Sequence, residues 1–167
     1  MTMRRSSVLA ALAVCVTATE ARADWQWTKW RMSEKELKEA AGALHMPLTQ
    51  YPSRADATLV DYKSAYKAQG FDFNVSLTLG QNHGLLSVTL YPKDSADCAR
   101  LRTMLRNSVY GEPWYESPAS HVTSSLMWED KPNGNQVEFS QSGVAGSKYL
   151  SCSVRYTELP LPGKSGL

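Results

Sequence analysis

The segment 71–79 constrains the fold of this chain most strongly, because its side chains alternate strictly between apolar and polar. Successive side chains of a strand point to opposite faces, so the apolar positions share one face and the polar positions share the other. A strand of this kind needs a hydrophobic layer on one side and water on the other, which is typical of an antiparallel sheet covered on one face. The apolar positions are Phe71, Phe73, Val75, Leu77 and Leu79.

Five further segments are predicted strands. A loop at 80–84 contains two glycines and predicts a hairpin, whose returning strand would bury Leu86, Val88 and Leu90. A second hairpin turn is predicted at 131–135, where proline, asparagine and glycine follow one another. The other strands are expected at 57–68, 121–129, 137–139 and 150–156.

Two helices are predicted, one before each group of strands. Ser33 has the hydroxyl of an N-cap, and Glu36 stands three residues later, as in a capping box. The first helix is expected to end near Gly42, and the second to begin at residue 94 or 95 and stop at Gly111. The apolar face of the second helix is expected to contain Cys98, Leu101, Leu105 and Val109.

The predicted fold class is α+β, an antiparallel sheet of about six strands with both helices packed on one face. The elements follow in the order αβββ–αβββ, which indicates an internal duplication. Residues 24–158 are predicted to form this one domain. The tail 159–167 is rich in proline and glycine and is predicted to be disordered.

Residues 1–23 have the pattern of a cleavable secretory signal. Arg4 and Arg5 precede a mostly apolar stretch, and a small-residue cleavage motif ends at Ala23, directly before Asp24. The apolar stretch of about a dozen residues is shorter than the roughly 20 that a membrane-spanning helix needs. We therefore expect a periplasmic or secreted protein. Two alternatives stay open: a lipid anchor at Cys15, which lies in a partial lipobox, and a buried core helix.

The charge of the expected mature chain is balanced. The full chain has 18 lysines and arginines and 16 acidic residues, and removal of residues 1–23 leaves 15 of each. A chain without a surplus of positive charge lacks the field that attracts nucleic acid or an anionic membrane. We expect no nucleic-acid partner and no transmembrane segment in the mature chain.

The mature chain keeps two cysteines, Cys98 and Cys152. An even pair in an oxidising compartment usually forms a disulfide. Cys98 is expected on the apolar face of the second helix, and Cys152 shares the phase of the buried residues in the last strand. Both would point into one helix–sheet interface, which predicts a disulfide between them. Two buried free thiols are the alternative.

Two short motifs resemble those of a group of small exported bacterial proteins. Residues 30–37 are similar to the "W-G-M-T-x-E-E-V" helix start of the SmpA/OmlA-type lipoprotein domain, with Arg31 where the motif has glycine. Residues 98–113 are similar to the "L-x-x-x-Y-G-x-P" helix end of the same group. Two such units in tandem are the architecture of the beta-lactamase inhibitory protein and its relatives. The resemblance implies that fold, and a fold alone does not imply a function.

Catalytic and metal-binding patterns are absent from the sequence. The three histidines, His45, His83 and His121, have no other ligand at metal-binding spacing, and nucleophile and phosphate-binding motifs do not occur. We expect no metal, no cofactor and no catalytic residue. An envelope enzyme with an unrecognised site is the alternative.

The aromatic residues are the best functional indication. Trp114 and Tyr115 lie in a predicted loop, 111–120, that is rich in glycine, proline and serine. These two residue types are the most enriched at binding hot spots, so we predict that they contact another protein. Packing at the end of the core is the alternative. The chain is interpreted as an exported protein-binding module of the inhibitor or immunity type, with an envelope-assembly accessory protein as the second interpretation.

Overall fold

The structure is a computed structural model that describes residues 25–52, 58–117, 123–143 and 149–160. The expected signal segment with its cleavage site at Ala23 and Asp24, the expected lipid-anchor residue Cys15, and the tail beyond residue 160 lie outside these ranges. The elements are α1 (Glu34–Ala43), β1 (Thr49–Pro52), β2 (Leu59–Ala68), β3 (Phe71–Gly80), β4 (Gly84–Pro92), α2 (Asp97–Met104), η1 (Leu105–Val109), β5 (Tyr115–Glu116), β6 (Thr123–Asp130), η2 (Lys131–Asn133), β7 (Asn135–Ser142) and β8 (Ser151–Glu158).

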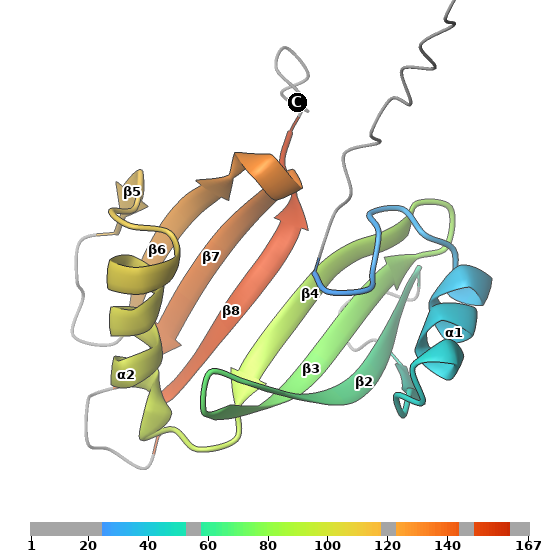
Figure 1. Cartoon of the computed structure of the whole chain (residues 1–167), viewed down its shortest axis with the longest axis horizontal. Coiled ribbons are helices and arrows are strands. Elements are labelled where there is room, and N and C mark those ends of the chain that lie inside the picture. Colours follow the sequence, from blue (N-terminus) through green and yellow to red (C-terminus); the bar gives the residue numbers. More distant parts are fainter. Residues whose placement is uncertain (1–24, 53–57, 118–122, 144–148, 161–167) are drawn as a thin grey trace, which may run out of the picture.

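All described strands form one antiparallel sheet in the order β1-β2-β3-β4-β8-β7-β6-β5. Each half of the chain contributes four consecutive strands, and the halves meet where β4 pairs with β8 (Figure 1). This join is a ladder of four residue pairs, from Ser87 with Thr157 to Leu90 with Val154. Figure 1 shows α1 and α2 at opposite ends of the sheet, with β4 and β8 side by side between them.

The predicted α+β class, with two α-helices and an antiparallel sheet, is confirmed, but the sheet has eight strands instead of about six. The two additional strands, β1 and β5, are the edges of the sheet and have four and two residues. β5 lies inside the segment that was predicted to be a loop. Strands this short cannot show a two-residue period, and they form because a longer neighbour offers its backbone hydrogen-bonding groups.

Local sequence sets the start of α1. The Ser33 hydroxyl accepts a hydrogen bond from the Glu36 N–H, and the Glu36 carboxylate accepts one from the Ser33 N–H, so the predicted capping box is present. Leu37 is buried on the inner side of the helix. The Tyr62 hydroxyl of β2 donates to Glu34 at 2.6 Å, which places α1 over the sheet face that carries Tyr62.

α2 covers the same face of the sheet. Cys98 of α2 forms the predicted disulfide with Cys152 of β8, and their Cα atoms lie 5.8 Å apart. The Arg100 guanidinium stacks over the ring of Phe71, 3.8 Å from its centre. Among the described helices, none is long and apolar enough to cross a membrane.

The end of α2 differs from the expectation. η1 is a π-helical turn, in which the Tyr110 N–H donates to the carbonyl of Leu105, five residues earlier. A π turn inserts a residue relative to α-helical spacing, so the side chains after Leu105 are rotated around the axis. Val109 was expected on the apolar face and is instead 49% exposed, while Tyr110 packs against the core.

A β-bulge corrects the expected phase of β4. The register between β3 and β4 shifts after Thr78, so Leu79 pairs with Leu85, Thr78 pairs with Ser87, and Leu86 is the extra residue. Leu86 was expected to be buried. It is 37% exposed, and Leu85 takes the buried position.

The two faces of the sheet have opposite chemistry. On the face under the helices, one row of paired residues crosses the sheet and is almost entirely apolar: Tyr62, Leu77, Val88, Tyr156, Val137 and Trp128. The neighbouring row points to the opposite face and is almost entirely polar: Thr49, Lys63, Ser76, Thr89, Arg155, Glu138, Met127 and Tyr115. The one-sided core that the alternation in 71–79 predicts is therefore present.

Replacement of Cys98 and Cys152 together by alanine is expected to lower the free energy of unfolding by about 4 kcal/mol. The bridge spans 54 residues of sequence, and its loss frees that loop in the unfolded chain. Denaturant unfolding of the double variant against the oxidised wild type measures the change. Wild-type protein reduced with dithiothreitol is the control and should lose a similar amount, whereas a loss below about 1 kcal/mol would contradict the expectation.

Gly84→Ala is expected to destabilise the fold by about 2 to 4 kcal/mol. Gly84 has a φ of +65°, and a Cβ there would lie 2.2 Å from the carbonyl oxygen of Arg31, which is backbone and cannot rotate away. Gly42→Ala is the matched control, because a Cβ at Gly42, in α1, would meet no neighbouring group within 4 Å. That variant should gain about 0.5 kcal/mol. A melting temperature of Gly84→Ala equal to or above that of Gly42→Ala would contradict the expected difference.

Candidate functional site

The loop 111–117, here named the aromatic loop, carries the two predicted contact residues on the surface. Trp114 and Tyr115 are 59% and 43% exposed, and their ring centres lie 5.9 Å apart. Neither residue belongs to the hydrophobic core. The two rings are therefore not packed in the core, which was the alternative to a contact role. They form a small apolar patch that faces solvent.

The backbone of the aromatic loop is held along β6. The Trp114 N–H donates to the carbonyl of Met127 at 3.0 Å, and the Ser117 N–H donates to the carbonyl of Ser125 at 2.9 Å. The indole Nε1 of Trp128, a core residue, donates to the carbonyl of Gly111 at 2.8 Å. The loop is thus fixed at its beginning, middle and end.

Two arginines on the helix hold the carboxylates on either side of the aromatic pair. Arg106 binds both carboxylate oxygens of Glu112, with a shortest distance of 2.5 Å, and also approaches Glu116 at 3.4 Å. Arg102 binds Glu116 at 2.8 Å. The Arg106 hydrogen bond, with a smaller effect of its charge, lowers the pKa of the Glu112 carboxyl. A bidentate arginine–carboxylate pair also fixes orientation.

The ion pairs of the aromatic loop were missed at the level of sequence. The available signal was the four-residue spacing of Arg102 and Arg106, which puts both guanidinium groups on one side of a helix. Glu112 and Glu116 have the same spacing, but they lie in a loop, where spacing does not define a face. Only the path of the chain from η1 back to β6 brings the two pairs together.

A hollow of about 390 Å³ lies beside Trp114. Its lining combines three aromatic rings and a proline with charged side chains of both signs: Tyr110, Glu112, Trp114, Trp128, Glu129, Lys131 and Pro132. The aromatic loop therefore combines a protruding apolar group and a neighbouring depression.

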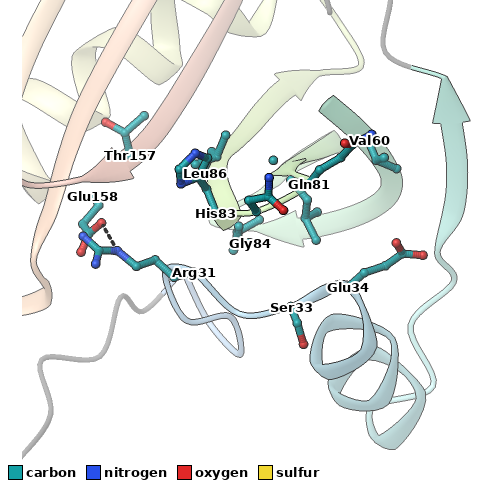
Figure 2. A pocket seen from close by; sticks show the side chains of 14 residues that line it. Arg31, Ser33, Glu34, Val60, Gln81, His83, Gly84, Leu86, Thr157 and Glu158 are labelled. Carbon is teal, nitrogen blue, oxygen red and sulfur yellow. Dashed lines mark hydrogen bonds and ion pairs between the residues drawn. The ribbon is translucent and has the colours of Figure 1, made fainter. Parts of the chain in front are cut away.

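A larger hollow of about 890 Å³ lies between residues 31–34, the β3–β4 hairpin and the end of β8 (Figure 2). Its charged groups are already engaged. Arg31 pairs with Glu158 at 3.0 Å, as the dashed line in Figure 2 marks, and Glu34 pairs with Lys38 at 2.6 Å. His83 lies on the hairpin side of this hollow, and its side chain is exposed.

The remaining candidate residues that the structure describes lie in separate elements. Within the described ranges, no group of three histidine, cysteine or acidic side chains is placed to hold a metal ion. His45 follows α1 and His83 lies in the β3–β4 turn, both exposed, and His121 lies outside the described residues. Cys98 and Cys152 are joined to each other.

No family model, curated protein or solved structure matches this chain significantly. The resemblance of residues 30–37 and 98–113 to the SmpA/OmlA group therefore stays a prediction. Arg31, which stands where the motif has glycine, adopts a φ of 65°, a conformation in which glycine meets no steric cost.

The order of the aromatic loop is expected to depend on pH through Glu112. Because its pKa is lowered, the contact with Arg106 stabilises the loop above the ordinary carboxyl pKa and is lost as the pH falls through the lowered value. NMR relaxation of the Trp114 amide, followed from neutral to acidic pH, should show mobility rising in that window. In Glu112→Gln the Trp114 amide should be mobile at every pH, without the transition on acidification. Glu39→Gln, on α1, should behave as wild type. If the pH dependence of Trp114 relaxation in Glu112→Gln is identical to that of wild type, protonation of Glu112 is not its cause.

Proposed function

We propose that this chain is an exported protein-binding module of the inhibitor or immunity type, and that the aromatic loop is its contact site. The observation that carries the proposal is the exposure of Trp114 and Tyr115, side by side, in a loop that ion pairs hold on both sides. Tryptophan and tyrosine are the residues that most often dominate the binding energy of an interface.

The rigidity of the aromatic loop supports this role. Binding costs free energy when loops and side chains must be ordered at the interface. Here the backbone of Trp114 is already bonded to β6, and Glu112 and Glu116 are already bonded to the helix. Most of the ordering has therefore taken place before a partner arrives, which favours tight binding.

The surroundings of the two rings are suited to a protein surface. Tyr115 pairs with Met127 on the sheet face that the helices do not cover, and Trp114 borders the 390 Å³ hollow. Around that hollow, Glu129 and Lys131 form an ion pair at 3.2 Å. An apolar centre with a polar rim is the usual composition of an interface. A partner would bury both rings and place one side chain in the hollow.

Export and the tandem architecture belong to the same proposal. The Cys98–Cys152 disulfide is compatible with a protein that matures outside the cytoplasm, and residues 1–23 have the pattern of a signal. The described elements repeat the order α-β-β-β-β in each half. This repetition supports an internal duplication and the SmpA/OmlA-like interpretation.

Trp114→Ala is expected to weaken partner binding by about thirtyfold or more and to leave the free energy of unfolding within about 0.5 kcal/mol. The partner is first isolated by capture from an envelope extract on oxidised protein comprising residues 24–167. Affinities of the purified pair are then measured by calorimetry for wild type and variants.

Tyr51→Ala is the matched control for Tyr115→Ala, because both tyrosines are 43% exposed and both lie on edge strands, at opposite ends of the sheet. Loss of affinity in Trp114→Ala and Tyr115→Ala, with normal binding by Tyr51→Ala, supports the contact site. Equal affinities for all variants, or a large fall in stability of Trp114→Ala, would refute it. A hydrolase or toxin as the partner supports the inhibitor type, and an envelope-assembly component supports the accessory type instead.

A further inference from the structure

A cavity of about 310 Å³ lies on the covered face of the sheet, above the join of the two halves. Its floor is formed by Leu90 of β4 and Val154 of β8, which pair with each other and are almost completely buried. Segments that are distant in sequence surround it: the start of the described chain at Trp25, the end of β2, the start of β3, and the helix of the second half. We name it the central cavity.

One wall of the central cavity is a continuous set of aromatic rings. Trp25 meets Tyr66 edge to face with ring centres 5.2 Å apart, Tyr66 lies 6.4 Å from Phe73, and Phe73 lies 5.8 Å from Phe71. Each ring is held by its neighbours, so the wall is preformed. The opposite wall is aliphatic and comes from the second half of the chain, with Leu101, Met104, Leu105 and Val109.

The polar groups of the central cavity include a pair of tyrosine hydroxyls. The Tyr110 hydroxyl donates to that of Tyr156 at 3.4 Å, which is longer than a normal hydrogen bond between hydroxyl groups. Burial raises the pKa of Tyr110 and raises that of Tyr156 well above its ordinary value, so both stay neutral and can donate or accept. A hydroxyl has one donor and two acceptor positions, so the pair keeps hydrogen-bonding capacity beyond this shared contact.

The charges around the central cavity disfavour an anion. The described lining residues include no lysine, arginine or histidine, and their one carboxylate belongs to Asp130. That carboxylate accepts hydrogen bonds from the side-chain amides of Asn133 and Asn135. An anionic ligand would lose its hydration here without contacting a positively charged lining residue.

We propose that the central cavity binds a small uncharged organic molecule, whose apolar body lies against the aromatic wall and whose hydroxyl or carbonyl oxygen bonds to the Tyr110–Tyr156 pair. The volume is at the lower end of the range that is usual for ligand sites, and a mostly apolar lining with a few convergent polar groups is the usual composition. The central cavity shares Tyr110 with the hollow beside Trp114, but the proposal does not depend on the function of the aromatic loop.

Three probes with the same body and different head groups test the proposal by NMR titration of the oxidised protein. 4-Ethylphenol carries a neutral hydroxyl, ethylbenzene carries no head group, and 4-ethylbenzoate carries a negative charge. We expect saturable shifts of Leu90, Leu105 and Val154 with 4-ethylphenol and a Kd of about 1 mM or tighter. Ethylbenzene should bind about tenfold more weakly, and 4-ethylbenzoate should not saturate.

Two sets of variants locate the binding. Tyr110→Phe combined with Tyr156→Phe should reduce the affinity for 4-ethylphenol to that for ethylbenzene, because the bonding hydroxyls are gone. Val109→Trp should fill the cavity from its aliphatic wall and abolish binding. Leu44→Trp is the matched control, since Leu44 is 52% exposed and Val109 is 49% exposed, and it should bind as wild type. Thermal melts establish that each variant is folded.

Several outcomes would overturn the proposal: no saturable shift with 4-ethylphenol, equal binding of 4-ethylbenzoate, or unchanged affinity in folded Val109→Trp. Binding that survives the double tyrosine replacement unchanged would remove the polar half of the proposal. A cavity that only holds water would give no saturable shift with 4-ethylphenol. Should Val109→Trp fail to fold, the head-group preference and the double tyrosine variant still distinguish a ligand site from a cavity that holds only water.

Discussion

The ladder between β4 and β8 determines the arrangement of the rest of the molecule. It joins the last strand of each half by only four residue pairs, and it makes one sheet of two four-stranded units. Because the last strands lie in the middle, the first strands β1 and β5 become the edges, and α1 and α2 lie at opposite ends of the covered face. Additional contacts cross the join, including the hydrogen bond from the Trp30 indole to the buried Asn135 side chain.

This arrangement also accounts for the two features with functional interest. Helices at the two ends of a curved face leave its middle to be filled by other groups, and the rings around Trp25 and Tyr66 fill it incompletely, so the central cavity lies above the join. The aromatic loop lies at the edge of the sheet that β5 forms. After η1 the chain returns to β6 through this loop, in which Tyr115 and Glu116 are the two-residue strand β5. Trp114 and Tyr115 are exposed there.

Much of the fold could be predicted from local patterns. The capping box at Ser33, the alternation in 71–79 and the turn at 131–135 each depend on neighbouring residues and not on distant contacts. The disulfide joins two elements, and it could be predicted because Cys98 and Cys152 are the only cysteines after residue 23. The failures have a common origin. Val109 and Leu86 were assigned by counting along the chain, and counting fails wherever a residue is inserted, as in the π turn at η1 and the bulge in β4.

The chain's own residue pattern determined the class of fold and the one-sided core, because periodicity and capping are properties of neighbouring residues. It also predicted the disulfide, because only two cysteines follow residue 23 and each shares the phase of a buried face. Tertiary structure decided the rest. It added the edge strands β1 and β5, brought Arg102 and Arg106 to the carboxylates of Glu112 and Glu116, and placed the Tyr110 and Tyr156 hydroxyls together at the central cavity. These features join residues from different elements, and their distances follow from how the two halves pack, which no local pattern contains.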